Sequence, residues 1–268
     1  MFNFMENFLL PSKVEFKSGE TELTGALVVT PCFHGYGTTL GNALRRVLLS
    51  SLSGGAVEAF KIKGTQHEFT TVEGVQEDVV EIILNLKQLA VKVYGDESVT
   101  LNLVKKGPGP VTGADIESNS NAEVISKDLL ICNLTTNKTL EMEIIVGKGR
   151  GFVPVEEKDK KNYPLGTIVI DSVYTPVKDV GYHVEYTRVG DITNYEKLTV
   201  NIETNGTISP QDAVSQSVKI LIDHFSIILS SVASTQPEFV AQEPEVAQDE
   251  VVEESEEEKP KKKVSKKK

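Results

Sequence analysis

The sequence has little cysteine and no tryptophan. Its two cysteines, Cys32 and Cys132, lie far apart, and neither belongs to a Cys-x-x-Cys or zinc-ligand pattern. Disulfide frameworks and zinc sites require cysteines at regular, closer spacings. We therefore expect two free, buried thiols in a reducing compartment.

Long apolar runs are also missing. No stretch of about 18 apolar residues occurs, so the sequence predicts no membrane-spanning helix and no membrane partner. The opening string MFNFMENFLLPSK has no basic segment and no small-residue cleavage site. A signal peptide needs both, so we expect a cytoplasmic protein.

The common catalytic patterns are absent. The sequence contains no GxSxG string, no P-loop and no HExxH motif, which enzymes use to place a nucleophile, a phosphate or a zinc ion. The string KGRGF, with Gly147, Gly149 and Gly151, opens no helix. The string HGYGTTLG precedes a helix but lacks the P-loop lysine. We interpret Gly35 and Gly37 as a tight turn, and we predict no catalytic, cofactor-binding or metal-binding residue in this chain.

Charge is unevenly distributed. The formal net charge is -11. An acidic run, Glu238–Glu258, is followed by a lysine-rich run, Lys259–Lys268, and together they contribute -3, so the body carries the other -8. Residues 235–268 have too few large apolar side chains to offset the entropy of ordering, so we expect a disordered tail. The acidic body lacks the basic face that nucleic-acid binding requires.

Strand patterns dominate residues 1–234. Apolar residues alternate with polar ones in TLEMEIIV and KLTVNIET, which predicts half-buried antiparallel strands. LAVKVYGDESVTLNLV alternates in the same way around Gly95-Asp96, which predicts a hairpin. Strands and helices do not alternate regularly, so we predict an α+β fold with no doubly wound parallel sheet.

Three segments have helical spacing. TTLGNALRRVLLSSL can begin at Thr38 or Thr39, GVQEDVVEIILNLK has acidic residues in its first turn, and SPQDAVSQSVKILIDHFSIIL can be capped by Ser209. His224 lies within the third segment, where we expect a core or interface histidine. The apolar stripe of the first helix consists of Leu40, Ala43, Leu44, Val47 and Leu48.

The third helix carries more apolar residues than one stripe can hold. Ile220 and Ile227 fall outside the stripe that contains Leu221, Ile222, Phe225 and Ile228. A helix that is apolar nearly all round must be covered on two sides. The second cover can come from a second copy of the chain, or the helix can be buried within its own domain. Arg46 and Leu49 on the first helix are neighbours of the kind found at interfaces, and a solvated face remains the alternative.

Five strings, in order, carry a resemblance: GYGTTLGNALRRVLLSS, HEFTTVEGVQEDVVEIILNLK, GPGPVTGADI, VGKGRGFVP and ETNGTISPQDA. Together they resemble the α subunit of bacterial DNA-directed RNA polymerase, over roughly residues 6–232. The resemblance implies a discontinuous dimerisation domain, an antiparallel sheet with two long helices, at 1–53 and 177–234. It implies an inserted, mostly β domain at 54–176.

The resemblance also implies partners. Such a subunit dimerises and serves as the assembly platform for β and β′ in DNA-templated transcription, with omega and sigma in the holoenzyme. The polymerase is a nucleotidyltransferase whose Mg²⁺ belongs to the large subunit. The implied large-subunit contacts are Arg46, Leu49, Lys87, Ile170 and Arg45. The dimer contacts implied through the first and third helices are Leu40, Leu44, Val47, Leu48, Leu221, Ile222, Phe225 and Ile228.

Two departures from the family are visible. Phe33 and His34 replace a charged pair that usually precedes the glycine turn. The family also continues into a helical C-terminal domain that binds promoter DNA, and this sequence has the acidic and lysine-rich tail instead, so the resemblance carries no promoter contact over to it. A dimeric nucleic-acid-binding regulator that uses the lysine run is one alternative. A small-molecule enzyme that uses the glycine turns is another.

Overall fold

The computed structural model describes residues 10–65, 67–159, 163–190 and 192–233. The chain forms two compact units, residues 1–227 and 228–268, and of the second unit only the end of the last helix is described. The predicted tail and its lysine run lie outside the described residues. The fold is a mixed α+β structure in which every described strand pairing is antiparallel, as predicted.

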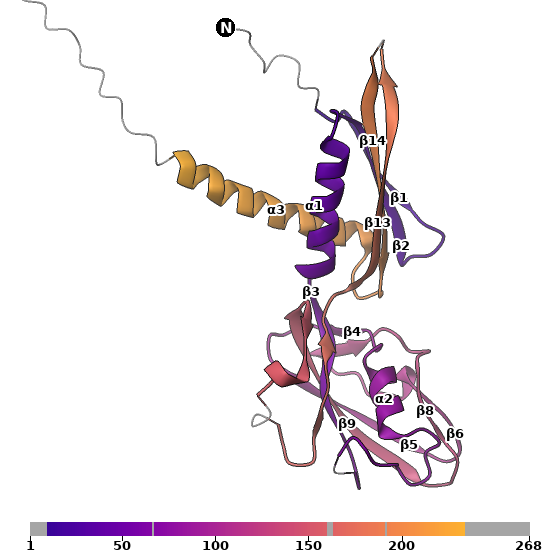
Figure 1. Cartoon of the computed structure of the whole chain (residues 1–268). Helices are drawn as coiled ribbons and strands as arrows, with labels where there is room; N and C mark the ends of the chain where they lie inside the picture. Colours follow the sequence, from indigo (N-terminus) through magenta and orange to yellow (C-terminus); the bar gives the residue numbers. More distant parts are fainter. Residues whose placement is uncertain (1–9, 66, 160–162, 191, 234–268) are drawn as a thin grey trace, which may run out of the picture. The chain divides into compact units, whose positions relative to one another are not determined.

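A four-stranded sheet joins strands from both ends of the described chain (Figure 1). Its strand order is β1-β2-β14-β13, with β1 at Lys13–Ser18, β2 at Thr24–Cys32, β13 at Val177–Val189 and β14 at Ile192–Thr204. The predicted alternation of KLTVNIET is confirmed, because Leu198, Val200 and Ile202 are buried. These side chains pack against the two long helices.

Helix α1 spans Tyr36–Ser50 and packs against β13 and β14. The prediction that Thr38 or Thr39 caps it is wrong. Its N-cap is Gly35, which has a φ of 82° and no side chain to cap with. Gly41 lets the helix pack closely on the sheet, since a Cβ there would lie 2.7 Å from the Tyr182 ring.

Helix α3 spans Pro210–Ala233. Its predicted start is confirmed: the Ser209 hydroxyl accepts a hydrogen bond from the Asp212 N–H at 3.1 Å and donates one to the Asp212 carboxylate at 2.7 Å. Proline at the first helical position loses no helical hydrogen bond there. His224 is exposed, so the alternative of a core histidine is wrong.

A second hydrophobic core lies around a six-stranded sheet. Its order is β5-β9-β3-β4-β7, and β11 pairs with β3. The strands are β3 (Ser53–Ile62), β4 (Val91–Val93), β5 (Val99–Lys106), β7 (Ala122–Val124), β9 (Thr139–Arg150) and β11 (Ile168–Val169). Smaller elements surround it: strand pairs β6 (Gly109–Thr112) with β8 (Leu130–Leu134) and β10 (Phe152–Val153) with β12 (Ser172–Val173), and short 3₁₀ turns η1 (Gly113–Asp115) and η2 (Val155–Glu157).

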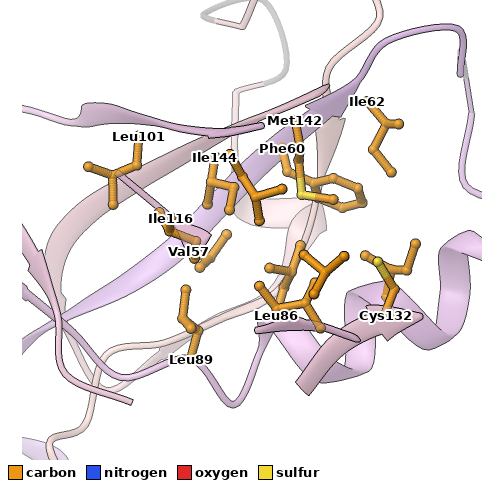
Figure 2. Close-up of a cluster of buried hydrophobic side chains, with 14 of the residues drawn as sticks. Val57, Phe60, Ile62, Leu86, Leu89, Leu101, Ile116, Cys132, Met142 and Ile144 are labelled. Atoms are coloured by element: carbon orange, nitrogen blue, oxygen red, sulfur yellow. The ribbon is translucent and has the colours of Figure 1, made fainter. Parts of the chain in front are cut away.

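The core of this region is built on β3 and β9. Alternate residues of TLEMEIIV are buried, as predicted, including Met142 and Ile144. Figure 2 shows these side chains gathered with Phe60 from β3 and Leu86 from helix α2 (Val79–Leu86). Cys132 joins the same cluster, and both cysteines are free and buried, as predicted.

The hairpin predicted around Gly95-Asp96 is wrong. β4 pairs with β3 and β7, whereas β5 pairs with β9. A two-residue Asn-Gly-type turn needs positive φ, and Gly95 does not adopt it. β5 instead matches Leu101 with Ile144 and Leu103 with Met142, which buries both strands' apolar faces together.

Helix α2 is shorter than the helix that its sequence pattern predicts. It begins at Val79, and the Asp78 carboxylate accepts the Glu81 N–H at 2.7 Å. Glu77, predicted in the first turn, accepts bonds from the backbone and side chain of Asn133 instead, both at 2.7 Å. That long-range pairing takes the preceding residues out of the helix.

Candidate subunit interface

Helix α1 has two adjacent apolar stripes. Gly37, Gly41, Leu44 and Leu48 face the sheet and are buried. The second stripe, which we call the open stripe, consists of Tyr36, Leu40, Ala43 and Val47. Each of these residues directly precedes one of the four buried residues. Tyr36 is 43% exposed and Leu40 is 37% exposed, whereas Ala43 and Val47 are half-buried.

The predicted single stripe of α1 therefore needs correction. Leu44 and Leu48 are 7% and 0% exposed, and they belong to the chain's own core. Their burial leaves no side-chain surface for a second copy of the chain. Leu40 and Val47, also predicted as dimer contacts, lie on the open stripe.

Arg45 and Arg46 are exposed on the same helix. Within the described residues, neither guanidinium forms an ion pair. Leu49 is half-buried against the core, and its carbonyl oxygen accepts a bond from the Thr175 hydroxyl at 3.2 Å. Two unpaired arginines beside a partly covered leucine can bind carboxylates or carbonyls of another chain.

Helix α3 changes character along its length. Ala213, Val214 and Ser217 in its first turns are buried, and Leu221 is half-buried. Beyond that point the apolar side chains are open to solvent. The residues that are more than half exposed are Ile222, Phe225, Ile227, Ile228, Leu229 and Val232. An exposed apolar run of this length on one helix is typical of a protein–protein contact.

Lys87, which directly follows α2, lies close to Ile170 in the segment before β12. The Lys87 ammonium binds the Asp171 carboxylate at 2.7 Å, and each side chain is about a third exposed. This hydrogen bond is the main reason that the pKa of Asp171 lies below its usual value. Ile170 is only 2% exposed and packs in the core, so it cannot contact another chain directly.

Lys158 holds the segment around Ile170 in place. Its ammonium donates to the carbonyl oxygens of Glu58 and Ile170, at 3.1 and 2.5 Å, and to the Ser172 hydroxyl at 2.6 Å. Burial lowers the pKa of Lys158. This role is not indicated by the sequence, because Lys158 stands in a run of charged residues, which is typical of a solvated segment.

Glycines in or next to the strings HGYGTTLG and KGRGF lie against side chains of the same chain. The N–H groups of Gly35 and Gly37 bind the carboxylate of Glu196. On β9, a Cβ at Gly147 would collide with the Glu58 carboxylate, and one at Gly149 with the Tyr174 ring. Both motifs make room for the chain's own side chains.

The described residues bear on two further kinds of chemistry, metal binding and thiol reactivity. They contain no cluster of histidine, cysteine or carboxylate groups that could hold a metal ion. Burial raises the pKa of the Cys132 thiol to about 12, which keeps it unreactive at neutral pH. None of the described helices has the length and hydropathy to cross a bilayer. The described residues thus form an α+β fold whose helices α1 and α3 carry exposed apolar side chains.

Comparison with known proteins gives the family. Residues 60–175 match the family described as "RNA polymerase Rpb3/RpoA insert domain". A DNA-directed RNA polymerase subunit alpha of Clostridium botulinum strain Eklund 17B is 50% identical over 219 residues, covering 82% of this chain and 70% of the relative. The corresponding subunit of Clostridium kluyveri is 52% identical over 206 residues, covering 77% of this chain and 65% of the relative. The chain belongs to the family of bacterial DNA-directed RNA polymerase α subunits.

Proposed function

We propose that this chain homodimerises and acts as the assembly platform for the β and β′ subunits of a DNA-directed RNA polymerase. The observation that carries the proposal is the exposed apolar surface of α1 and α3 in a member of the α-subunit family. The chain itself is a non-catalytic subunit, and the Mg²⁺ chemistry of transcription belongs to the large subunits. The proposed site of action is the bacterial cytoplasm.

The proposed dimer contact combines the open stripe of α1 with the exposed part of α3. Leu40 and Val47 contribute from α1, and Ile222, Phe225 and Ile228 contribute from α3, with Leu221 at its edge. Removing such side chains from water stabilises association by about 25 cal/mol per Å² of apolar surface. A closed dimer uses the same patch on both copies, which also prevents open-ended aggregation.

The proposed large-subunit contacts lie on a different surface. Arg46, Arg45 and Leu49 form one group on α1, and Lys87 with Asp171 forms another. Ile170 acts on the second group from beneath, because its own side chain is buried. Two identical copies would each present these groups, one to β and the other to β′.

The proposed domain division follows the two hydrophobic cores. One core is built from residues of β2, α1, β13, β14 and α3, which supports a dimerisation domain at 1–53 and 177–234. The other lies between Val57 and Ile170, which supports an inserted domain at 54–176. The family match at 60–175 covers nearly the same segment.

Co-expression with untagged β and β′ subunits tests the proposal. We expect the tagged chain to purify as a dimer with β bound, and then with both large subunits. A chain that elutes as a monomer at micromolar concentration, and that leaves β behind, would refute it.

A further inference from the structure

Glu196 occupies an inward position of β14. Residues two apart on a strand face the same side, so Glu196 shares the face of Leu198, Val200 and Ile202. Its side chain is accordingly buried, with the residue only 5% exposed. The pairing with β2 shifts register here, because two steps on β14, Glu196 to Leu198, face three on β2, Cys32 to Val29. The extra residue of this bulge therefore lies on β2, and the alternation of β14 is unbroken.

The carboxylate of Glu196 meets the start of α1. One oxygen accepts the Gly35 N–H at 2.8 Å and the other accepts the Gly37 N–H at 2.9 Å. The first N–H groups of a helix have no partner within the helix, and they carry partial positive charge. A buried carboxylate that accepts two of these N–H groups provides them with hydrogen-bond partners, and its own oxygens are hydrogen-bonded in return.

No side chain next to the start of α1 caps the helix. Gly35 has no side chain, and α1 has no acidic residue in its first turn. Gly37 leaves the space that the carboxylate needs, because a Cβ there would lie 2.7 Å from a Glu196 oxygen. His34 adds a contact at 3.3 Å from its Nδ1 to the same carboxylate. A residue 161 positions away thus supplies the helix cap.

The turn that Glu196 holds carries exposed aromatic and apolar side chains. Phe33 packs edge-on against Tyr36 and Tyr195, with ring centroids 6.3 and 6.4 Å apart. Tyr36 and Leu40 are one helical turn apart and begin the open stripe. Their positions depend on where α1 starts, and the two hydrogen bonds to Glu196 determine that start.

We propose that Glu196 is a positioning residue for association, which fixes the first turn of α1 so that Tyr36 and Leu40 face a second copy of the chain. This inference rests on the proposed dimer and names a residue that does not itself touch the partner. The amide of Glu196→Gln has similar size but only one accepting oxygen, so one of the two glycine N–H groups loses its partner.

The experiment is a double-mutant cycle on the full chain, with the dimer dissociation constant measured by analytical ultracentrifugation. Glu196→Gln is combined with Leu40→Ala, near the cap, and separately with Phe225→Ala, on α3. Glu185→Gln is the matched control, since Glu185 lies on the neighbouring strand, is half exposed and pairs with Lys197 at 2.9 Å.

We expect Glu196→Gln to weaken the dimer about tenfold, as the loss of one buried, charge-assisted hydrogen bond does. We expect this loss to shrink to less than threefold in the Leu40→Ala background and to persist in the Phe225→Ala background. Glu185→Gln should leave the constant unchanged. Equal effects in both backgrounds, or a wild-type constant for Glu196→Gln, would overturn the inference. If Leu40→Ala and Phe225→Ala both dimerise like the wild type, the proposed dimer contact fails instead.

Discussion

Helix α2 buries Val79, Ile82 and Leu86 completely against its sheet, whereas α3 leaves Ile222 and Phe225 more than half exposed. α2 does expose Val80 and Leu84, but these are one turn apart on a helix of only eight residues. The exposed apolar side chains of α3 continue from Ile222 to Val232. One region completes its core within a single chain, and the other leaves helix surface for something else to cover.

The difference separates two kinds of stability. The core around the six-stranded sheet should determine whether the chain folds, whereas the exposed helix surface should determine whether it associates. A substitution in the first region should therefore lower the free energy of unfolding. An equally drastic substitution in the second should change the oligomeric state and spare the fold.

The largest effect should come from the closed core. Phe60→Ala removes a fully buried ring beside Met142 and Ile144, and we expect a loss of about 3–5 kcal/mol in the free energy of unfolding. Urea unfolding, followed by circular dichroism, measures it. A matched substitution on the open surface, Phe225→Ala, should cost far less at concentrations where the chain is monomeric. Equal losses of unfolding free energy for Phe60→Ala and Phe225→Ala would contradict the distinction between the closed core and the open helix surface.

The next largest effect should be on association. Phe225→Asp places a charge on the exposed part of α3, and we expect the dimer to weaken by about 3 kcal/mol, the scale for burying a poorly compensated polar group. Light scattering across a dilution series measures this. The control is Val104→Asp on the edge strand β5, because Val104 is similarly exposed at 57%. A dimer that survives Phe225→Asp would place the contact elsewhere.

A smaller effect should separate the two proposed contact surfaces. Arg46→Ala should leave the dimer intact and weaken β binding by about 2 kcal/mol, as hot-spot arginines do. Pull-down titration with β measures the loss. Lys219→Ala, an exposed cation on α3, serves as the control. Wild-type affinity of Arg46→Ala for β would remove Arg46 from the proposed contact.

Regular periodicity in the sequence predicted much of the fold. The strands over Leu140–Val146 and Leu198–Ile202 were predictable because one face of each is buried and the period of two is unbroken. The Ser209 cap was predictable because its partner, Asp212, is three residues away. Local spacing is sufficient wherever the interaction itself is local.

Long-range partners explain the failures. The Gly95-Asp96 hairpin was wrong because β5 pairs with β9, a strand far along the chain. The capping of α1 was wrong because its cap comes from Glu196. One signal could have identified Glu196: extending the alternation of β14 back by two residues places a carboxylate on the buried face, where it needs a partner. Lys158 had no such signal.

The smallest predicted effect concerns the Lys87–Asp171 pair. The Lys87 ammonium holds the pKa of Asp171 below its usual value, so the pair stabilises the fold above pH about 3.9 and loses this contribution as the pH falls through the lowered pKa. Lys87→Met should therefore cost about 0.5 kcal/mol at neutral pH, since both groups are partly exposed. The difference between wild type and variant should shrink as the pH falls below 4.

Urea unfolding from pH 7 to pH 2.5 checks this sign. The control is Lys148→Met, because Lys148 pairs with Asp96, whose side chain is 94% exposed. Solvent screens that pair, so its removal should change the pH dependence less than Lys87→Met does, although Lys148 also lowers the pKa of Asp96. A loss from Lys87→Met that stayed constant or grew toward acid pH would mean that Lys87 stabilises the fold by a contact other than its ion pair with Asp171. It would also count against treating the Lys87–Asp171 group as a fixed feature that a large subunit can bind.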